Sequence, residues 1–391
     1  MPPRLNPVFA ERPMTIFAVM SALAREHDAV NLGQGFPDED GPVEIIEAAA
    51  RAIRKGPNQY APVHGVPELR EALAKANKRF YGLDVEWRNE TLVTAGATEA
   101  LAAAFFATLR PGDDALLIAP SYDSYAPIVE AAGARAVFLA PKPPGWRIIR
   151  EELEAALTPA TRVLALNSPH NPTGRVLTRE ELQAVADIAL ERDLLVICDE
   201  VYEHLVFDGL PHIPLMTLPG MRDRCVRIGS AGKTFSMTGW RIGYATGSEK
   251  LITGMLKAHQ FIAYTCPPHL QYAVAEGLMF GDDYYARFIA GMQAKRDFIM
   301  QGLAEVGFDV LPCEGTYFAT VDIRPVGRDD DAAFCREITE KAGVAAVPVS
   351  AFYPAGSDAA PRHYARFCFC KRRDVLEEAI ARLMKYFGKG G

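Results

Sequence analysis

Lys233 is the residue of this sequence best suited to covalent chemistry, and it lies in a short loop of sequence GSAGKT at residues 229–234. Apolar and aromatic residues follow it at Phe235, Met237 and Trp240, so we expect its amine to be partly shielded from water. Desolvation disfavours the charged form of a lysine, which lowers its pKa and makes the free amine available. Such an amine can form a Schiff base with a carbonyl compound.

A second candidate is Asp199, which ends the apolar run at residues 194–198. A carboxylate buried at such a place needs a cationic partner or dense hydrogen bonding. A lysine Schiff base together with an aspartate facing a pyridinium nitrogen is the protein side of pyridoxal phosphate (PLP) chemistry. Lys233 and Asp199 therefore point to that cofactor.

Other chemistries fit the same residues less well. The GKT of the lysine loop ends a Walker A pattern, but that pattern needs glycine where this chain has Arg227, so it is incomplete. Residues 33–35 (GQG) are only a fragment of a dinucleotide-binding fingerprint, and no nucleophile elbow surrounds Ser230. His204 and His212 lack the spacing of metal ligands, so we predict no metal site.

The elements that position these residues are short apolar runs alternating with helical segments. We expect strands at 92–94, 115–119, 163–166, 194–198 and 226–228, and helices at 68–81, 98–109, 151–157 and 179–192. This alternation predicts an α/β fold whose large domain has a mostly parallel central sheet flanked by helices. Polar residues follow the predicted strands at Gly96, Tyr122, Asn171, Asp199, Tyr202, Ser230 and Lys233. Ligands of such sheets bind beyond the carboxyl ends of the strands, so these residues should converge there.

The C-terminal third has a different pattern. A long helix is expected at 282–306, with strand-like segments at 315–321, 343–348 and 366–370. This predicts a smaller α+β domain. We place the large domain at residues 40–285 and the small domain at residues 1–39 and 286–391.

Composition excludes several broad classes. The 391 residues carry a net charge of −7, so no basic excess favours nucleic-acid binding. The longest apolar stretch, residues 101–109, is far shorter than the roughly 18–20 residues of a membrane span, and no membrane association is expected. The N-terminus has no signal-peptide pattern, and the seven dispersed cysteines form no C-x-x-C pair. We therefore expect a cytoplasmic protein with reduced thiols.

Eight motifs, taken in order along the chain, resemble those of one enzyme family. They are residues 31–37 (NLGQGFP), 58–60 (NQY), 96–100 (GATEA), 168–174 (SPHNPTG), 199–203 (DEVYE), 230–235 (SAGKTF), 238–243 (TGWRIG) and 366–369 (RFCF). The chain resembles the fold-type I, PLP-dependent class I/II aminotransferases. Within that family it is most similar to the branch of kynurenine/glutamine and bacterial methionine/aromatic aminotransferases. N-succinyl-diaminopimelate aminotransferases are nearly as similar.

The resemblance implies that PLP is the cofactor and that Lys233, Asp199 and Tyr202 are the catalytic set. Lys233 would carry PLP and shuttle a proton, and Asp199 would keep the ring nitrogen protonated. Further cofactor contacts are implied for Asn171 and Tyr202 at the phenolic oxygen, Tyr122 against the ring, and Gly96, Ala97, Thr98, Ser230 and Arg241 at the phosphate. Tyr60 would reach the cofactor phosphate of the neighbouring subunit, which implies a homodimer with shared active sites.

For the substrate, the resemblance implies that Arg366 binds the α-carboxylate, with Asn171 and Gly35 also in contact. The candidate lining is apolar and aromatic: Ile16, Phe17, Phe36, Tyr122 and residues 261–264. The pocket-forming motifs contain no second arginine that is not already assigned to the phosphate or the α-carboxylate, so none is left there for a distal carboxylate. We therefore expect a ping-pong aminotransferase that uses a large neutral L-amino acid, such as methionine, glutamine, an aromatic residue or kynurenine, and a 2-oxo acid.

Three alternatives stay open. An N-succinyl-diaminopimelate aminotransferase would need a cation for its distal carboxylates, for which Arg25, Lys257 and His259 are the candidates. A cysteine-conjugate β-lyase would use the same lysine and aspartate. A catalytically silent, PLP-sensing binding protein would need a DNA-binding module, and the sequence has no basic segment to form one.

Overall fold

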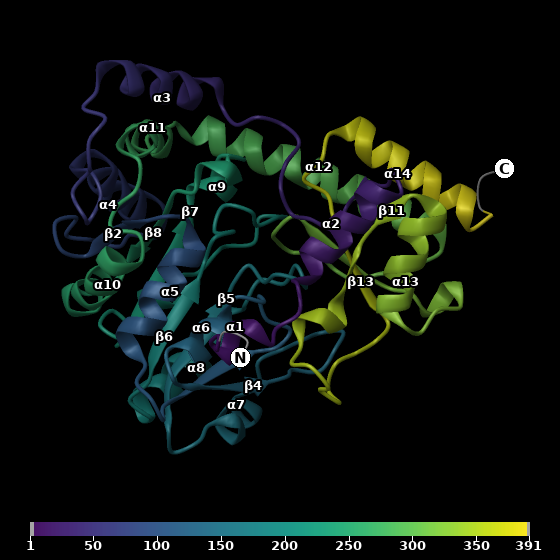
Figure 1. Ribbon diagram of the computed structural model, residues 1–391, viewed down its shortest axis with the longest axis horizontal. Helices are drawn as coiled ribbons and strands as arrows, with labels where there is room; N and C mark the ends of the chain where they lie inside the picture. Colours follow the sequence, from purple (N-terminus) through teal and green to yellow (C-terminus); the bar gives the residue numbers. More distant parts are fainter. Residues whose placement is uncertain (1–3, 389–391) are drawn as a thin grey trace.

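A seven-stranded sheet forms the centre of the computed structural model, which describes residues 4–388 (Figure 1). Its strands lie in the order β2-β8-β7-β6-β5-β3-β4. They are β2 (Thr91–Thr94), β3 (Asp114–Ile118), β4 (Arg135–Leu139), β5 (Thr161–Asn167), β6 (Leu195–Asp199), β7 (Cys225–Ser230) and β8 (Gly243–Thr246). β8 is antiparallel to both of its neighbours, and every other pairing is parallel. The prediction of a mostly parallel sheet is therefore confirmed, and β4 and β8 are the two strands that it did not include.

Both faces of this sheet are buried, which explains why its strands are apolar runs rather than alternating patterns. In β5, Val163 and Ala165 join a core with α5 (Ala97–Thr108) and α10 (Glu249–Ile262). Leu164 and Leu166 face the opposite core, which contains α7 (Arg150–Ala156) and α8 (Arg179–Glu191). Successive strand residues point to opposite faces, so each strand supplies both cores.

Further helices complete the large part of the molecule. They are α3 (Val43–Lys55), α4 (Pro67–Tyr81), α6 (Tyr125–Ala131), α9 (Ala231–Thr234) and α11 (Pro268–Leu278). α3, α4 and α11 enclose a third core around Phe235, two residues after the predicted catalytic lysine. The predicted helix at 68–81 corresponds to α4, which has Pro67 at its first turn and ends at Gly82 in the left-handed conformation.

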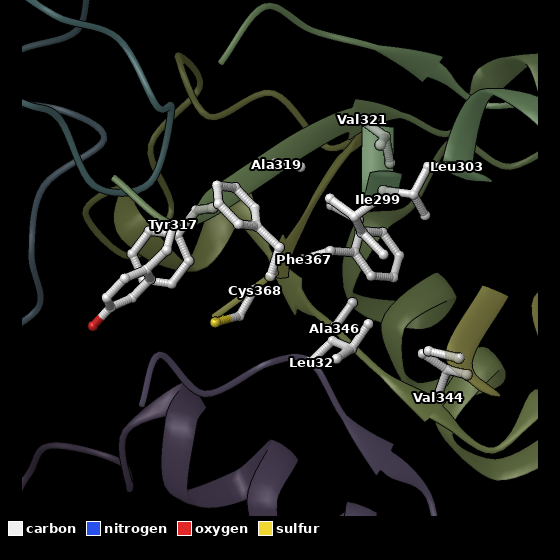
Figure 2. Packing of buried hydrophobic residues seen from close by; sticks show 14 of the residues in the cluster. Leu32, Ile299, Leu303, Tyr317, Ala319, Val321, Val344, Ala346, Phe367 and Cys368 are labelled. Carbon is white, nitrogen blue, oxygen red and sulfur yellow. The ribbon is translucent and has the colours of Figure 1, made fainter. Parts of the chain in front are cut away.

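The C-terminal part contains a four-stranded antiparallel sheet in the order β12-β13-β10-β9. Its strands are β9 (Asp309–Val310), β10 (Phe318–Asp322), β12 (Val347–Pro348) and β13 (Tyr364–Cys368), with helices α12 (Asp282–Val306), α13 (Asp331–Glu337) and α14 (Arg373–Tyr386). Figure 2 shows the apolar cluster in which residues of β10 and β13 pack against Ile299 and Leu303 of α12. No helix among residues 4–388 combines the length and the apolar character that crossing a bilayer requires.

The N-terminal segment packs with this C-terminal part. It contains α1 (Pro7–Ala10), α2 (Ile16–Glu26) and β1 (Val30–Asn31). β1 pairs in parallel with β11 (Val344–Ala345), and Figure 1 shows α2 beside the C-terminal elements. The division into residues 40–285 and residues 1–39 with 286–391 stays a prediction, and its boundary falls in the first turn of α12.

Two strand predictions differ from the structure. The segment 343–348 forms two separate strands, β11 and β12, which belong to different sheets. The segment 315–321 becomes a strand only at Phe318, because Thr316 has a φ of 69° and so interrupts the extended backbone. Residues 315–317 therefore form a turn, and Tyr317 lies in it.

Candidate active site

A cavity of about 330 Å³ lies beyond the carboxyl ends of the parallel strands. It is lined by Ala97, Thr98, Leu101, Tyr122, Asn167, Asn171, Asp199, Val201, Tyr202, Ser230, Lys233 and Arg241. All of these except Leu101, Asn167 and Val201 belong to the set predicted from sequence. The structure therefore brings together, from five different loops and strand ends, most of the residues that were expected to converge.

The pairing of β5 with β6 sets the position of two of these residues. Asn167, at the end of β5, lies in register with Asp199, at the end of β6. The Asn167 side chain donates to the Asp199 carbonyl oxygen at 2.9 Å and accepts from the Asn171 backbone N–H at 2.7 Å. Asn167 thus ties the loop that carries Asn171 to the strand that carries Asp199.

The cavity contains one carboxyl group and one amine whose pKa values move towards each other. Burial raises the pKa of Asp199 to about 6, and Tyr125 Oη donates to Asp199 Oδ2 at 2.6 Å. Burial also lowers the pKa of Lys233, whose Nζ donates to Tyr317 Oη at 2.8 Å. Because desolvation penalises both charged forms, the site favours a ligand that supplies a cationic group to the carboxylate and a carbonyl to the amine.

Another group of lining residues could hold an anion. Ala97 and Thr98 form the first turn of α5, where backbone N–H groups lack partners within the helix and the helix dipole is positive. Gly96 precedes them with a φ of 80°, and a Cβ atom there would overlap the guanidinium of Arg241. With Ser230, these groups could hold a phosphate or a similar anion.

Arg366 reaches the site from β13 of the C-terminal sheet and is fully buried. Its Nη1 donates to Asn171 Oδ1 at 2.7 Å, and its Nη2 donates to the Gly33 carbonyl at 2.5 Å. The Phe318 ring lies 3.9 Å from the guanidinium carbon, and Nε has no hydrogen-bond partner. Burial lowers the pKa of Arg366 to about 10, so it stays charged at neutral pH. Neither of its bonded acceptors carries a charge, which makes this arginine suited to a carboxylate ligand.

Two other predicted residues, Gly35 and Tyr60, are not among those that line the cavity. A Cβ atom at Gly35 would lie 2.6 Å from the Phe318 ring and 2.9 Å from the Tyr317 ring, so close packing alone requires glycine there. Tyr60 is 81% exposed and is not among the residues that line the cavity. Its ring packs against that of Tyr264 at 5.1 Å between centroids.

The predicted substrate lining is only partly assembled within one chain. Tyr122 lines the cavity, and the Phe17 ring lies 5.2 Å from the Arg366 guanidinium carbon. Ile16 is half-buried beside the C-terminal core, and Phe36 is 39% exposed. Residues 261–264 do not line the cavity of their own chain, and Phe261 is 86% exposed on its exterior.

Besides the apolar lining residues Leu101 and Val201, sequence reasoning missed three polar residues at this site: Tyr125, Asn167 and Tyr317. Tyr125 and Asn167 follow or end predicted strands, so the rule that selected Tyr122 could have selected them as well. Tyr317 precedes a strand of the other sheet, and no local pattern indicates that its hydroxyl meets Lys233.

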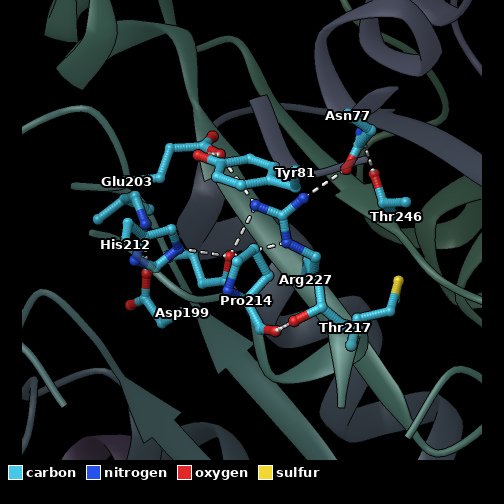
Figure 3. A network of polar contacts seen from close by, with 12 residues as sticks. Asn77, Tyr81, Asp199, Glu203, His212, Pro214, Thr217, Arg227 and Thr246 are labelled. Carbon is cyan, nitrogen blue, oxygen red and sulfur yellow. Dashed lines mark hydrogen bonds and ion pairs between the residues drawn. The ribbon is translucent and has the colours of Figure 1, made fainter. Parts of the chain in front are cut away.

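A buried polar network supports the turn that carries Asp199 and Tyr202 (Figure 3). Arg227 of β7 donates to Glu200 at 2.7 Å and to Glu203 at 2.9 Å. The two glutamates directly follow Asp199 and Tyr202 in the sequence. The arginine that breaks the Walker A pattern therefore anchors the turn behind the cavity.

Comparisons with known proteins agree with this geometry. The family model described as aminotransferase class I and II matches residues 27–383. A probable N-succinyldiaminopimelate aminotransferase of Mycobacterium tuberculosis is 49% identical, over 94% of this chain and 95% of its own length. The methionine aminotransferase of Escherichia coli is 40% identical over the same shares. The solved structure of the M. tuberculosis N-succinyldiaminopimelate aminotransferase superposes with a TM-score of 0.95 at 47% identity, covering 98% of this chain and all of that one.

Proposed function

Because this chain belongs to the class I and II aminotransferase family, we propose that the cavity beyond β5, β6 and β7 is where it transfers an amino group from an L-amino acid to a 2-oxo acid. The protein is a PLP-dependent aminotransferase. One observation carries the assignment of its residues: a desolvated amine, a desolvated carboxylate and an anion-binding helix terminus line a single cavity.

The residues present fit PLP at each of its functional groups. The N–H groups of Ala97 and Thr98, with Ser230 and Arg241, would hold the phosphate, and Lys233 would attach the aldehyde carbon covalently. The other contacts would come from Asp199 at the ring nitrogen, Asn171 and Tyr202 at the phenolic oxygen and Tyr122 against the ring. When bound, PLP supplies an electron sink that stabilises negative charge at the Cα atom of the substrate.

The chain's own groups then have distinct tasks. Arg366 binds the α-carboxylate of the substrate and orients its Cα hydrogen. The Lys233 amine, whose pKa burial lowers, takes that proton on Nζ and later releases it. General acid–base catalysis of this kind contributes roughly 10²–10⁴-fold. The Asp199 carboxylate keeps the pyridine nitrogen protonated, which its desolvated position favours.

A half-reaction screen tests this function. Single amino acids are added to the PLP enzyme without any oxo acid, and the cofactor absorbance and the oxo-acid product are followed. We expect stoichiometric formation of one oxo acid per site, with turnover resuming when a 2-oxo acid is added. Continuous pyruvate release from cysteine conjugates without an added oxo acid would identify the β-lyase instead.

We further propose that the amino donor is a large neutral amino acid. Aromatic side chains surround Arg366, and the cavity lining contains no cations other than Lys233 and Arg241, which the cofactor would occupy. An unpaired distal carboxylate would be costly to desolvate in such surroundings. We expect methionine and phenylalanine to exceed aspartate in kcat/KM by about 10–150-fold, since burying a side chain of that size contributes ~1.5–3 kcal/mol. Steady-state kinetics with the three donors side by side measures this ratio, and tenfold preference for aspartate would contradict it.

An N-succinylated diamino acid is the second candidate donor, favoured by the 49% identity to the M. tuberculosis relative. The candidate cations for its distal carboxylates lie away from the cavity. His259 is fully buried and contacts Glu99 at 2.9 Å, while Arg25 and Lys257 are exposed on α2 and α10. Assaying N-succinyl-diaminopimelate beside methionine decides between the two, and a tenfold advantage for the succinylated donor would replace the first proposal.

A homodimer with shared active sites is also proposed, and Tyr60 tests it. The exposed rings of Tyr60 and Tyr264 pack together, and Phe261 is also exposed. Exposed apolar side chains of this kind often mark protein interfaces. If Tyr60 reaches the partner's cofactor phosphate, Tyr60→Phe should weaken PLP retention roughly tenfold without changing secondary structure. Equilibrium dialysis measures retention, with Tyr386→Phe, which loses its bond to Glu337, as the control. If the protein sediments as a monomer in analytical ultracentrifugation and is fully active under the same conditions, the dimer is contradicted.

A further inference from the structure

Tyr317 stands between the predicted catalytic lysine and the chain segment that follows β1. It lies in the turn before β10, is 1% exposed, and packs at the margin of the apolar cluster with its hydroxyl pointing away from it (Figure 2). Its Oη accepts a hydrogen bond from Lys233 Nζ at 2.8 Å and donates one to the Gly35 carbonyl oxygen at 2.7 Å. Gly35 and Lys233 are therefore joined through a single phenol group.

The directions of these two hydrogen bonds follow from the groups involved. A carbonyl oxygen can only accept, so the one phenolic proton of Tyr317 is committed to Gly35. Towards Lys233, Tyr317 then presents only lone pairs, and the amine must donate. An amine that donates one N–H in this way keeps its own lone pair free. If Tyr317 donated to Nζ instead, it would occupy the lone pair that a base or nucleophile uses.

The surroundings hold the phenol in this orientation. The backbone N–H of Phe369 donates to the Tyr317 carbonyl at 2.9 Å, and the Tyr202 ring packs edge-on at 5.2 Å. Gly35 approaches so closely that any side chain at that position would strike the Tyr317 and Phe318 rings. The position of the acceptor carbonyl is thus set by packing, and the phenol has little freedom to turn.

We propose that Tyr317 is a positioning residue that holds the Lys233 amine, whenever this amine is not bonded to the cofactor, with its lone pair free and directed into the cavity. The proposal deepens the proposed function and rests on it. It predicts that removing the hydroxyl leaves substrate binding intact and impairs the steps in which Lys233 acts as base or nucleophile.

The test is Tyr317→Phe, which preserves the ring and its packing. We expect kcat to fall roughly tenfold, as the loss of one orienting hydrogen bond suggests, with KM for the amino donor nearly unchanged. The kinetic isotope effect with an α-deuterated donor should increase, because proton transfer becomes more strongly rate-limiting.

A second readout does not depend on turnover. The rate at which the apoenzyme takes up PLP is followed as a function of pH, which reports the protonation state of the Lys233 amine. Removing an acceptor for its N–H groups disfavours the ammonium form, so the midpoint of this profile should move to lower pH in Tyr317→Phe. A merely structural defect would lower the amplitude of the uptake profile, or the melting temperature of the protein, without moving the midpoint of the profile.

Tyr353→Phe is the matched control, since Tyr353 is also a buried tyrosine and its Oη accepts from Trp146 Nε1 at 2.9 Å, away from Lys233. It should keep the wild-type kcat, isotope effect and uptake midpoint. The proposal is overturned if Tyr317→Phe keeps kcat and the isotope effect within about twofold of wild type and leaves the uptake midpoint unchanged. It is also overturned if both variants change alike. A wild-type enzyme that fails to transaminate any donor would refute the proposed function itself, which is a different outcome.

Discussion

Lys233→Ala is expected to abolish transamination while the protein stays folded. The substitution removes the amine that would attach the cofactor and the base that would move the substrate proton. General acid–base catalysis alone accounts for roughly 10²–10⁴-fold, so loss of both roles should exceed that range. The fold should survive because the side chain ends in a cavity and its one hydrogen bond is to Tyr317.

The measurement for Lys233→Ala is turnover of the purified variant with methionine and phenylalanine, together with circular dichroism and thermal melting. Lys295→Ala serves as the control. Lys295 lies on α12 and forms an ion pair with Glu39 at 2.7 Å, away from the cavity lining. The control should turn over at the wild-type rate. Near-wild-type turnover of Lys233→Ala would remove the assignment of this lysine.

Asp199→Ala is expected to retain covalent attachment of PLP and to turn over very slowly. The variant loses the carboxylate that keeps the pyridine nitrogen protonated, so the ring accepts electrons poorly. We expect kcat to fall by more than tenfold, which corresponds to a barrier increase above ~1.4 kcal/mol. The buried Tyr125 hydroxyl would also lose its acceptor, which adds a modest cost in stability.

Single-turnover and steady-state kinetics of Asp199→Ala test this role. Asp114→Ala is the matched control, since Asp114 is also a buried strand carboxylate but lies at the amino end of β3, paired with Arg135. It should lose stability without a comparable loss of kcat. If Asp199→Ala kept more than about a tenth of the wild-type rate, the proposed role of Asp199 would have to be withdrawn.

Much of the fold could be predicted because the large domain depends on local patterns. The helix expected at 282–306 has the same bounds in the structure, where Gly281 precedes it and Gly307 ends it in the left-handed conformation. Parallel strands buried on both faces appear as apolar runs, and their carboxyl ends meet at one edge. The convergence of Asp199, Ser230 and Lys233 on one cavity follows from that rule.

The remaining features depend on contacts between distant segments. The strand β8 has only four residues, and its antiparallel direction is set by its two neighbours. The side chain of Arg366 meets Asn171 across 195 positions of sequence, and Tyr317 meets Lys233 across 84. The residues 261–264 were expected in the substrate pocket, but they lie at the exposed end of α10, outside the cavity of their own chain.

The most direct test of the central claim is to locate the covalently bound cofactor. The PLP enzyme is reduced with borohydride, digested, and mapped by mass spectrometry. We predict that the reduced cofactor is found on one peptide, attached to Lys233 in the sequence SAGKTF. A label on any other lysine, or a protein that binds PLP without any covalent label, would contradict the assignment of this cavity as the active site.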